Sequence, residues 1–295
     1  MAVADVGSVT AAASSIGISQ SAITEALKQL EDHLSATLFE RHAKGLALTL
    51  HGHQFLHHAH NILAAVSDAE RALTRETPSL SGSINLGVTS LVAGYYLADL
   101  LARFRRVFPN VLVKVHEDLR DYVEHLLVNG ELDLGLILVS NMTDRDALDC
   151  EVVVRSRNRV WLSPSHALAG AERISLALLC DQPLIQLDLD ESAETARRWW
   201  DHAYLQPRLA LKTASVEAVR SLVATGAGVA IMPDMTFRPW SLEGDRLEAR
   251  ALEDPLPTVD VGVAWRRGSP LSLPARTFIE LSREHGFGRA RTRPA

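Results

Sequence analysis

The segment spanning residues 7–52 constrains this chain most, because it predicts two short helices separated by a tight turn. Ser8 and Ser19 each stand where a hydroxyl can accept hydrogen bonds from the free backbone amides at a helix start. Gly17 and Ile18 lie between the two helices and predict the turn. In the second helix the apolar residues recur every three or four positions, which predicts one buried stripe, formed by Ile23, Leu27, Leu30 and Leu34.

The second helix also predicts a polar face near its beginning. Gln20, Thr24 and Lys28 are spaced so that they share a face away from the apolar stripe, and Ser21 lies beside them. Entry into the major groove of DNA requires small polar groups that approach closely and an amide that donates and accepts at once. A plain solvated helix has the same periodicity, so this spacing alone leaves both interpretations open.

Short motifs recur at fixed spacings through the whole segment. They are Ala12-Ala13 with Ile16, Ser19-Gln20 with Ala22 and Thr24, Leu30-Glu31 with Leu34, Leu38-Phe39 with Arg41, and Leu48-Thr49 with Gly52. In this combination the segment resembles the winged helix-turn-helix reader of the LysR-type transcriptional regulators. The resemblance implies a DNA-binding domain over residues 1–53, with its wing over residues 42–49. It also implies DNA contacts from Ser19, Gln20, Ser21, Thr24, Lys28, Arg41 and Lys44.

Three features depart from the pattern of that family. Glu25 places an acid where the family often has a basic or neutral polar residue, and Ser35 replaces the usual glycine after the reading helix. The family's first helix begins well before the position of Met1, so we expect the first helix here to be truncated. That expectation supports an alternative function, a solute-binding or sensor protein of the same fold that does not bind DNA.

Residues 54–77 predict one long linker helix that pairs with another helix. Its apolar residues fall at alternating intervals of four and three, which is a heptad seam formed by Phe55, Ala59, Ile62, Val66, Ala69 and Leu73. A helix that packs on its own domain is the alternative, but the resemblance implies the dimerisation helix of a two-fold reader. His53 and His57 lie four residues apart, yet no cysteine or carboxylate joins them, so we predict no metal site.

The rest of the chain predicts alternating strands and helices, which is typical of α/β architecture. A boundary rich in Ser, Pro and Gly precedes it at residues 77–83. Five strings resemble the LysR effector-binding domain, which has the fold of periplasmic type II binding proteins: residues 81–90, 100–111, 126–137, 160–170 and 216–233. We therefore expect an α/β multidomain chain with a two-lobed effector domain. Its expected bounds are residues 84–290, with lobe 1 over 84–156 and 259–290 and lobe 2 over 157–258.

The resemblance implies a small-molecule site between the two lobes. Thr89 and Ser90 end a strand and open a helix, whose free amides can bind an anion or a carbonyl, although Thr89 as a plain helix cap is the alternative. The expected cleft residues are Thr89, Ser90, Leu138, Val139, Gln186, Leu187, Asp188, Ser215, Val216, Gly228 and Val229. Acids cluster at Asp188, Asp190 and Glu191 without a matching base, which favours an apolar or weakly acidic effector over a strongly anionic one.

Composition and motifs argue against several other classes of protein. The net charge of −6 does not predict nucleic-acid binding, so that prediction depends on the motifs alone. Cys150 and Cys180 suit neither a disulfide framework nor a zinc site. The N-terminus lacks the basic region of a signal peptide, and no apolar run is long enough for a membrane span, which predicts a cytoplasmic protein. The common hydrolase, zinc-peptidase and phosphate-loop motifs are missing, which predicts no catalysis and no cofactor.

These expectations describe a ligand-responsive transcriptional regulator. The expected partners are double-stranded DNA with an interrupted inverted repeat, a small-molecule effector, and further copies of the chain in a homodimer or homotetramer. RNA polymerase is a further expected partner. The expected mechanism is a population shift, in which the effector alters the closure of the lobes and so the packing between the dimers and the bend of the DNA.

Overall fold

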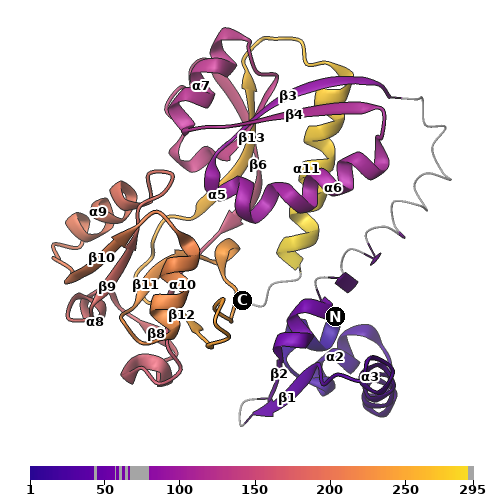
Figure 1. Cartoon of the computed structure of the whole chain (residues 1–295), viewed down its shortest axis with the longest axis vertical. Helices are drawn as coiled ribbons and strands as arrows, with labels where there is room; N and C mark the ends of the chain where they lie inside the picture. Colours follow the sequence, from indigo (N-terminus) through magenta and orange to yellow (C-terminus); the bar gives the residue numbers. More distant parts are fainter. Residues whose placement is uncertain (43–44, 57, 60–61, 64–65, 67–79, 292–295) are drawn as a thin grey trace. The chain divides into compact units, whose positions relative to one another are not determined.

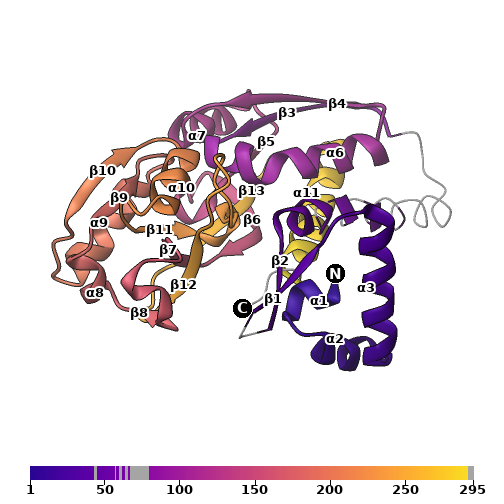
Figure 2. The ribbon, with the colours of Figure 1, turned by 60° about the horizontal axis from the view of Figure 1, so that its bottom comes forward.

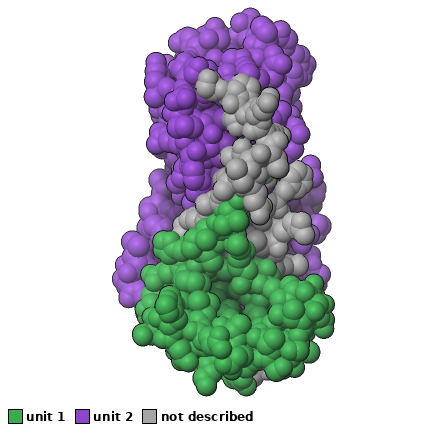
Figure 3. Space-filling view, turned by 90° about the vertical axis from the view of Figure 1, so that its right-hand side faces the viewer, with its two compact units in different colours: residues 1–78, 287–295 green, residues 79–286 purple. Residues whose placement is uncertain are grey.

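The computed structural model describes residues 1–42, 45–56, 58–59, 62–63, 66 and 80–291, with side chains up to residue 286. The chain divides into two compact units, Met1–Pro78 with Phe287–Ala295, and Ser79–Gly286, which Figure 3 shows in separate colours. The predicted Lys44, Ala69 and Leu73 lie outside the described residues.

The first unit begins with three helices and a two-stranded wing (Figures 1 and 2). The helices are α1 (Ala2–Val6), α2 (Val9–Ile16) and α3 (Gln20–Leu34). The wing consists of β1 (Phe39–His42) and β2 (Gly45–Leu48), which pair antiparallel. The Ser8 hydroxyl accepts from the amide of Ala11 at 3.3 Å, and Gly17 adopts a left-handed φ of 73° after α2. The predicted helix-turn-helix arrangement is therefore confirmed.

The core of the first unit is small and is built mostly from short side chains. Val3, Ala12, Ala13 and Ile23 are buried there. Ile23 belongs to the predicted apolar stripe, in which Leu27 and Leu30 are half-buried. Leu34 is 36% exposed, so the prediction that it is buried is wrong. The reason is its position at the last turn of α3, beyond the reach of these short side chains.

Another helix follows the wing directly. Residues 50–56 are helical, as are the described residues that follow them up to Val66. The Thr49 hydroxyl accepts from the amide of Gly52 at 2.9 Å and donates to the carbonyl of Thr37 at 2.7 Å, which fixes the start of this helix. Along the predicted seam Phe55 and Ala59 are half-buried, whereas Ile62 is 60% exposed and Val66 is 50% exposed.

The second unit has two lobes, and each lobe has its own β-sheet (Figure 1). The sheet of lobe 1 has the strand order β4-β3-β5-β13-β6. These strands are β3 (Gly82–Val88), β4 (Val111–Glu117), β5 (Leu134–Leu138), β6 (Leu148–Ser156) and β13 (Val259–Arg266). Strand β3 pairs parallel with β4 and β5, whereas β13 pairs antiparallel with β5 and β6.

Helices cover both faces of the lobe 1 sheet (Figure 2). One face carries α5 (Ser90–Val92), a π-helical turn (Ala93–Leu97), α6 (Ala98–Val107) and α11 (Leu273–Arg291). The other face carries α7 (Arg120–Asn129). Neighbouring side chains of β5 point to opposite faces, so Leu136 joins the core under α6 and Ile137 joins the core under α7.

Lobe 2 contains a four-stranded sheet of order β11-β7-β12-β8 and a parallel pair, β10 and β9. Its strands are β7 (Asn158–Leu162), β8 (Arg173–Ile174), β9 (Leu184–Leu187), β10 (Leu209–Thr213), β11 (Ala230–Pro233) and β12 (Glu248–Leu252). Its helices are α8 (Leu176–Cys180), α9 (Ser192–His202) and α10 (Val216–Ala224). Short 3-10 turns span Ala167–Gly170 and Asp234–Thr236 in this lobe and Val139–Asn141 in lobe 1.

The chain passes between the lobes twice, at Arg157 between β6 and β7, and again between β12 and β13. One hydrophobic core is shared by both lobes: it contains Leu91 and Val92 of lobe 1 together with Leu187 and Val216 of lobe 2. The two-lobed α/β architecture expected from the sequence is therefore confirmed. Strand β8 has only two residues and β12 is partly polar, so neither gives a clear strand pattern in the sequence.

Candidate functional site

Helix α3 is the element that the sequence predicts to read DNA, and polar contacts fix both of its ends. The Ser19 hydroxyl accepts from the amide of Ala22 at 3.2 Å at the start. At the end of the helix Ser35 adopts a left-handed φ of 49°. Its backbone amide donates to the carbonyls of Glu31 and Asp32 and so closes the last turn. Serine thus takes the backbone conformation for which glycine is usual at this point.

The polar face of α3 is open to solvent along its length. Ser19, Gln20, Ser21, Thr24 and Lys28 are all exposed. The Ser21 hydroxyl lies 3.0 Å from the Ser19 hydroxyl, and Thr24 donates to the carbonyl of Gln20 at 2.9 Å, so both short side chains are held close to the helix. In the wing Arg41 is exposed and lies opposite Leu46.

Two glutamates on α3 have different contacts. Glu25, the unexpected acid, accepts from the side-chain amide of Gln29 at 2.9 Å on the exposed face. Glu31 instead binds the backbone amides of Leu38 at 2.6 Å and Phe39 at 3.1 Å. Glu31 therefore attaches the reading helix to the first strand of the wing.

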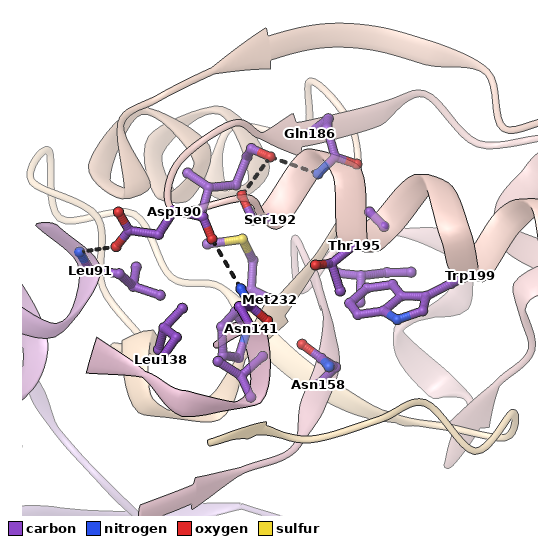
Figure 4. A pocket seen from close by; sticks show the side chains of 15 residues that line it. Leu91, Leu138, Asn141, Asn158, Gln186, Asp190, Ser192, Thr195, Trp199 and Met232 are labelled. Atoms are coloured by element: carbon purple, nitrogen blue, oxygen red, sulfur yellow. Dashed lines mark hydrogen bonds between the residues drawn. The ribbon is translucent and has the colours of Figure 1, made fainter. Parts of the chain in front are cut away.

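In the second unit a pocket lies between the two lobes, with a volume of about 470 Å³ that includes space open to solvent (Figure 4). Lobe 1 contributes Leu91 at the start of α5 and Leu138 at the end of β5. Lobe 2 contributes the end of β9, the first turns of α9 and strand β11. The walls are mainly apolar, as in most small-molecule sites, with a few polar groups among them.

Asp190 is the ionisable residue among those that line the pocket. Its carboxylate crosses to lobe 1 and accepts from the amide of Leu91 at 2.6 Å, a contact visible in Figure 4. Burial raises the pKa of Asp190, while the hydrogen bond from Leu91 opposes that rise. The Thr89 hydroxyl is close enough to lower this pKa as well, but it makes no hydrogen bond of normal geometry and does not cap the helix.

The next residue, Glu191, makes a second link between the lobes. It accepts from Arg120 Nε at 3.1 Å, and Asn141 Nδ2 lies 3.4 Å from both the Glu191 carboxylate and the Asp190 carbonyl. Arg120 also pairs with Glu124, whose side chain is fully buried. Both Asp190 and Glu191 have a left-handed φ, 48° and 58°, which costs residues with a Cβ about 1 kcal/mol or more. The contacts across the cleft hold this strained turn in place.

Two amide side chains complete the polar lining of the pocket. Gln186 donates through Nε2 to the carbonyl of Leu187 at 2.7 Å, and Asn158 donates through Nδ2 to the carbonyl of Pro257 at 2.9 Å. Because these backbone carbonyls can only accept, the side-chain NH2 group must be the atom that faces each of them. The side-chain oxygen of each amide takes no part in this hydrogen bond. The oxygen of Asn158 is buried and has no hydrogen-bond partner in the described part of the chain.

The structure places some of the expected effector residues on this pocket and others elsewhere. Leu138, Gln186 and Leu187 line it. Ser90 is bound to Glu117, Asp188 is paired with Lys212, and Ser215 caps α10. Thr89, Val139, Val216, Gly228 and Val229 are buried in the surrounding structure and do not line it.

The expected cleft residues did not include six polar or aromatic residues that do line the pocket, although the sequence places one of them, Asp190, in an acidic cluster near the cleft: Asn141, Asn158, Asp190, Ser192, Thr195 and Trp199. Asn141 and Asp190 follow the ends of β5 and β9, and the position after a strand end was the available signal. The others come from the beginnings of β7 and α9, and only the tertiary structure brings them together.

Family comparison decides what kind of protein has this arrangement. A family described as "LysR substrate binding domain" matches residues 78–286, and one described as "Bacterial regulatory helix-turn-helix protein, lysR family" matches residues 1–53. The chain belongs to the LysR family of transcriptional regulators. It is a ligand-responsive, DNA-binding regulator of this type, and its helix-turn-helix domain favours that function over a sensor that does not bind DNA.

Other LysR-type regulators resemble this one over most of its length. The chain is 27% identical over 280 residues to the HTH-type transcriptional regulator YwqM of Bacillus subtilis, which covers 93% of both chains. It is 28% identical over 288 residues to a probable hydrogen peroxide-inducible genes activator of Mycobacterium leprae, covering 95% of this chain and 90% of that protein. The crystal structure of HinK, a LysR family regulator from Pseudomonas aeruginosa, superposes with a TM-score of 0.65 at 26% identity, covering 96% and 94%.

The described part of the chain contains neither a membrane-spanning helix nor a cluster of metal-binding side chains. Among the described residues no helix is both long and apolar enough to pass through a membrane. Histidine, cysteine and acidic side chains in the same residues form no group of three that could hold a metal ion.

Proposed function

We propose that this LysR-family regulator reads DNA with the exposed polar face of α3. The observation that carries the proposal is the combination of a capped helix with exposed Gln20, Thr24 and Lys28 along one side. Gln20 and Lys28 differ in chemistry: an amide can pair with the edge of adenine, whereas an ammonium is a flexible point charge suited to phosphate. Ser19, Ser21 and Thr24 approach the bases or backbone beside them, and Arg41 and Lys44 in the wing meet phosphates.

The test separates base reading from phosphate contact. The wild-type protein first selects DNA from a random library, and binding is then titrated with salt on the selected and a scrambled sequence. We expect Gln20→Ala to cost about 1–3 kcal/mol on the selected DNA only. We expect Lys28→Ala to weaken both DNAs and to lower the salt slope by about one. Gln29→Ala, a polar change on the same helix, is the control. Equal losses on both DNAs for Gln20→Ala would refute base reading.

We also propose that the effector binds in the pocket between the lobes. Residues of both lobes line it, so a ligand there changes the contacts that hold the lobes together. Leu138, Gln186 and Leu187 form its walls, and the pair Asp190–Leu91 spans it. A ligand that binds one degree of closure better than another shifts the population of the two states, which is the physical basis of the response. The other expected residues do not line the pocket, and in this proposal they support its walls: Thr89, Ser90, Val139, Asp188, Ser215, Val216, Gly228 and Val229.

The proposal includes self-association. Ile62 and Val66 are large, apolar and at least half exposed on the helix that follows the wing, which suits a second helix packed on them. In lobe 1 the edge strand β4 exposes Leu112 and Val115, and in lobe 2 the edge strand β10 exposes Leu209 and Leu211. Unprotected apolar edges favour pairing with another chain. A helical surface on the first unit together with strand edges on the second favours a homotetramer built from homodimers. In this proposal the tetramer binds an interrupted inverted repeat in the cytoplasm, close to RNA polymerase.

Peroxide sensing, which the name of the Mycobacterium leprae relative suggests, is not favoured for this regulator. The chain has two cysteines, Cys150 in β6 of lobe 1 and Cys180 in α8 of lobe 2, and both are free thiols. Burial raises the pKa of the Cys150 thiol, which disfavours the reactive thiolate. We therefore propose a regulator that responds to a bound molecule and carries out no chemistry on it.

A further inference from the structure

We propose that the pocket between the lobes selects an effector with an apolar, flat body that carries a hydrogen-bond donor, an amine or a hydroxyl, and that it rejects carboxylates. This inference rests on the proposed role of the pocket as the effector site. The sequence led us to expect an apolar or weakly acidic effector; the geometry of the polar lining now replaces the weak acid with a donor.

The charge of the pocket lining disfavours a carboxylate ligand. Asp190 is the ionisable side chain among the pocket-lining residues, all of which lie in the described part of the chain, and no Lys, Arg or His stands beside it there. A carboxylate ligand would be desolvated against this like charge with no cation to compensate it. An ammonium or hydroxyl group in the same position would meet an acceptor.

The backbone amides at the start of α5 are the group that the sequence predicts to bind an anion or a carbonyl of the effector. In the structure the chain's own Asp190 occupies this position, with Oδ2 2.6 Å from the amide of Leu91 and only 9% of the residue exposed. The anion that suits these amides is therefore already part of the protein. Glu191, bound to Arg120 in lobe 1, holds the same turn in place.

Two amide side chains among the lining residues have acceptors to spare. The nitrogens of Gln186 and Asn158 are bound to the carbonyls of Leu187 and Pro257, so both oxygens remain as acceptors. The Asn158 oxygen is buried, lacks a partner, and lies on a residue that is 8% exposed. Figure 4 shows this amide on the same side of the pocket as the Trp199 ring. A buried acceptor without a partner is costly, and a ligand donor would satisfy it.

The walls of the pocket suit a ligand with a flat apolar body. Apolar side chains from both lobes, among them Leu138, Met232 and Ile231, form the walls, and the Trp199 indole closes one side. Flat apolar groups pack well against an indole face. The combination of acceptors with apolar walls describes a small aromatic amine or alcohol.

The test uses three probes with the same phenyl framework: 2-phenylethylamine, 2-phenylethanol and phenylacetate. Binding to the full-length protein is measured by calorimetry, at one ionic strength. We expect the amine and the alcohol to bind at least tenfold more tightly than phenylacetate. Thr195→Phe, which fills the pocket from α9, should abolish binding of the amine, whereas Arg197→Phe on the exposed side of the same helix should not. Phenylacetate binding as tightly as the amine would overturn the proposal.

A second measurement tests the role of Asp190 itself. Asp190→Ala frees the Leu91 amide and removes the negative charge, so the preference should reverse toward phenylacetate by at least tenfold. Asp190→Asn keeps an acceptor for Leu91 and should reduce the preference for the amine without such a reversal, which guards against a folding defect in the alanine variant. Asp181→Ala, an exposed acid of lobe 2, is the matched control for charge. Unchanged selectivity in both Asp190 variants would refute the inference.

The outcomes distinguish this inference from the proposed function. If carboxylate binds tightly and Thr195→Phe abolishes it, the pocket is the effector site but the chemical class is wrong. If no probe binds, or if all bind equally to Thr195→Phe, the proposed pocket and the inference both fail. The DNA-reading test of Gln20 and Lys28 is independent of either result.

Discussion

The two units of this regulator differ in the interactions that stabilise each of them internally. Fully buried Phe104, Trp161 and Phe278 give the effector unit large apolar contacts. The reader has short buried side chains such as Ala12 and Ala13, and its stability depends more on polar contacts that join helix ends and wing. A small unit buries a smaller share of its surface and gains less from the hydrophobic effect. The comparison teaches that the same kind of substitution should have different effects in the two units.

The reader also leaves large apolar side chains in solvent. Ile16 is 52% exposed and Ile18 is 49% exposed, both next to the turn between α2 and α3, and Ile62 and Val66 are exposed on the following helix. Grouped apolar exposure of this kind marks surfaces that another chain covers. The stability of the reader should therefore depend more on association than that of the effector unit, which also exposes apolar side chains but has a large core of its own.

The largest effect is expected from Ile62→Asp combined with Val66→Asp. Two charges on the predicted seam would be desolvated in a paired helix, so we expect the dimer to dissociate and DNA binding to be lost. Sedimentation measures the first and gel shift the second. Leu63→Asp, an equally apolar neighbour at 53% exposure outside the predicted seam, is the control. Unchanged mass and unchanged DNA binding in the double variant would contradict the proposed role of the seam.

Phe104→Ala should give the next largest effect and should be confined to the effector unit. Its ring is fully buried and packs on Phe278 and Phe108 at centroid distances of 5.0 and 5.2 Å. Loss of a buried phenylalanine typically costs about 3–5 kcal/mol. All five tryptophans lie between residues 161 and 265, so tryptophan fluorescence during urea unfolding reports the effector unit alone.

Phe108→Ala is the matched control, because Phe108 directly follows α6, is only half-buried and should cost less. A loss below about 1 kcal/mol for Phe104→Ala would show that the core can close over the missing ring. The contrast between the two units would then have to be given up.

Glu31→Ala tests the polar half of the comparison. It removes the acceptor of two backbone hydrogen bonds, from Leu38 and Phe39, and hydrogen bonds to charged groups are worth about 1.5–3 kcal/mol. We expect faster hydrogen exchange of the Leu38 and Phe39 amides and weaker DNA binding. The urea midpoint of the effector unit, detected by tryptophan fluorescence, should not change. Glu25→Ala, which loses only an exposed contact to Gln29, should not speed amide exchange at Leu38 and Phe39 and should not weaken DNA binding. Identical behaviour of the two alanine variants would show that Glu31 does not anchor the wing.

The same contrast explains what could be predicted from the sequence. In the reader the caps, turn and polar face depend on neighbours within a few positions, so Ser8, Gly17 and Ser19 could be placed from their spacing alone. Leu34 was misplaced because burial depends on what lies beneath a helix, which periodicity does not describe.

The pocket could be predicted only in part, because residues distant in the chain form it. The lobes and most strands follow from local patterns, and Leu138, Gln186 and Leu187 were found at strand ends. Asp190 meets Leu91 across 99 positions of sequence, through a turn with left-handed residues that no local pattern predicts. The expectation that the amides after Thr89 and Ser90 are free for an anion or a carbonyl of the effector could not account for a carboxylate supplied by the other lobe.

The smallest effect is expected at Tyr95, one of the polar links between the two lobes of the effector unit. Its hydroxyl, in the π-helical turn of lobe 1, donates to Glu217 of lobe 2 at 2.8 Å. Burial raises the pKa of Tyr95 to about 12, and the hydrogen bond to Glu217 adds to the rise. At neutral pH we expect Tyr95→Phe to cost about 0.5–1.5 kcal/mol, the usual contribution of one hydrogen bond.

The pH dependence separates this link from a simple packing contact. Because the pKa of Tyr95 is higher in the folded protein, its unfolded form loses the proton first as pH rises above about 10. The wild-type effector unit should therefore lose stability between about pH 10 and pH 12, and the Tyr95→Phe variant should lose less over the same range. Urea midpoints from tryptophan fluorescence measure both, and Tyr204→Phe, at a residue that is 96% exposed, is the control. Parallel curves for wild type and Tyr95→Phe across this range would show that the hydroxyl does not link the lobes.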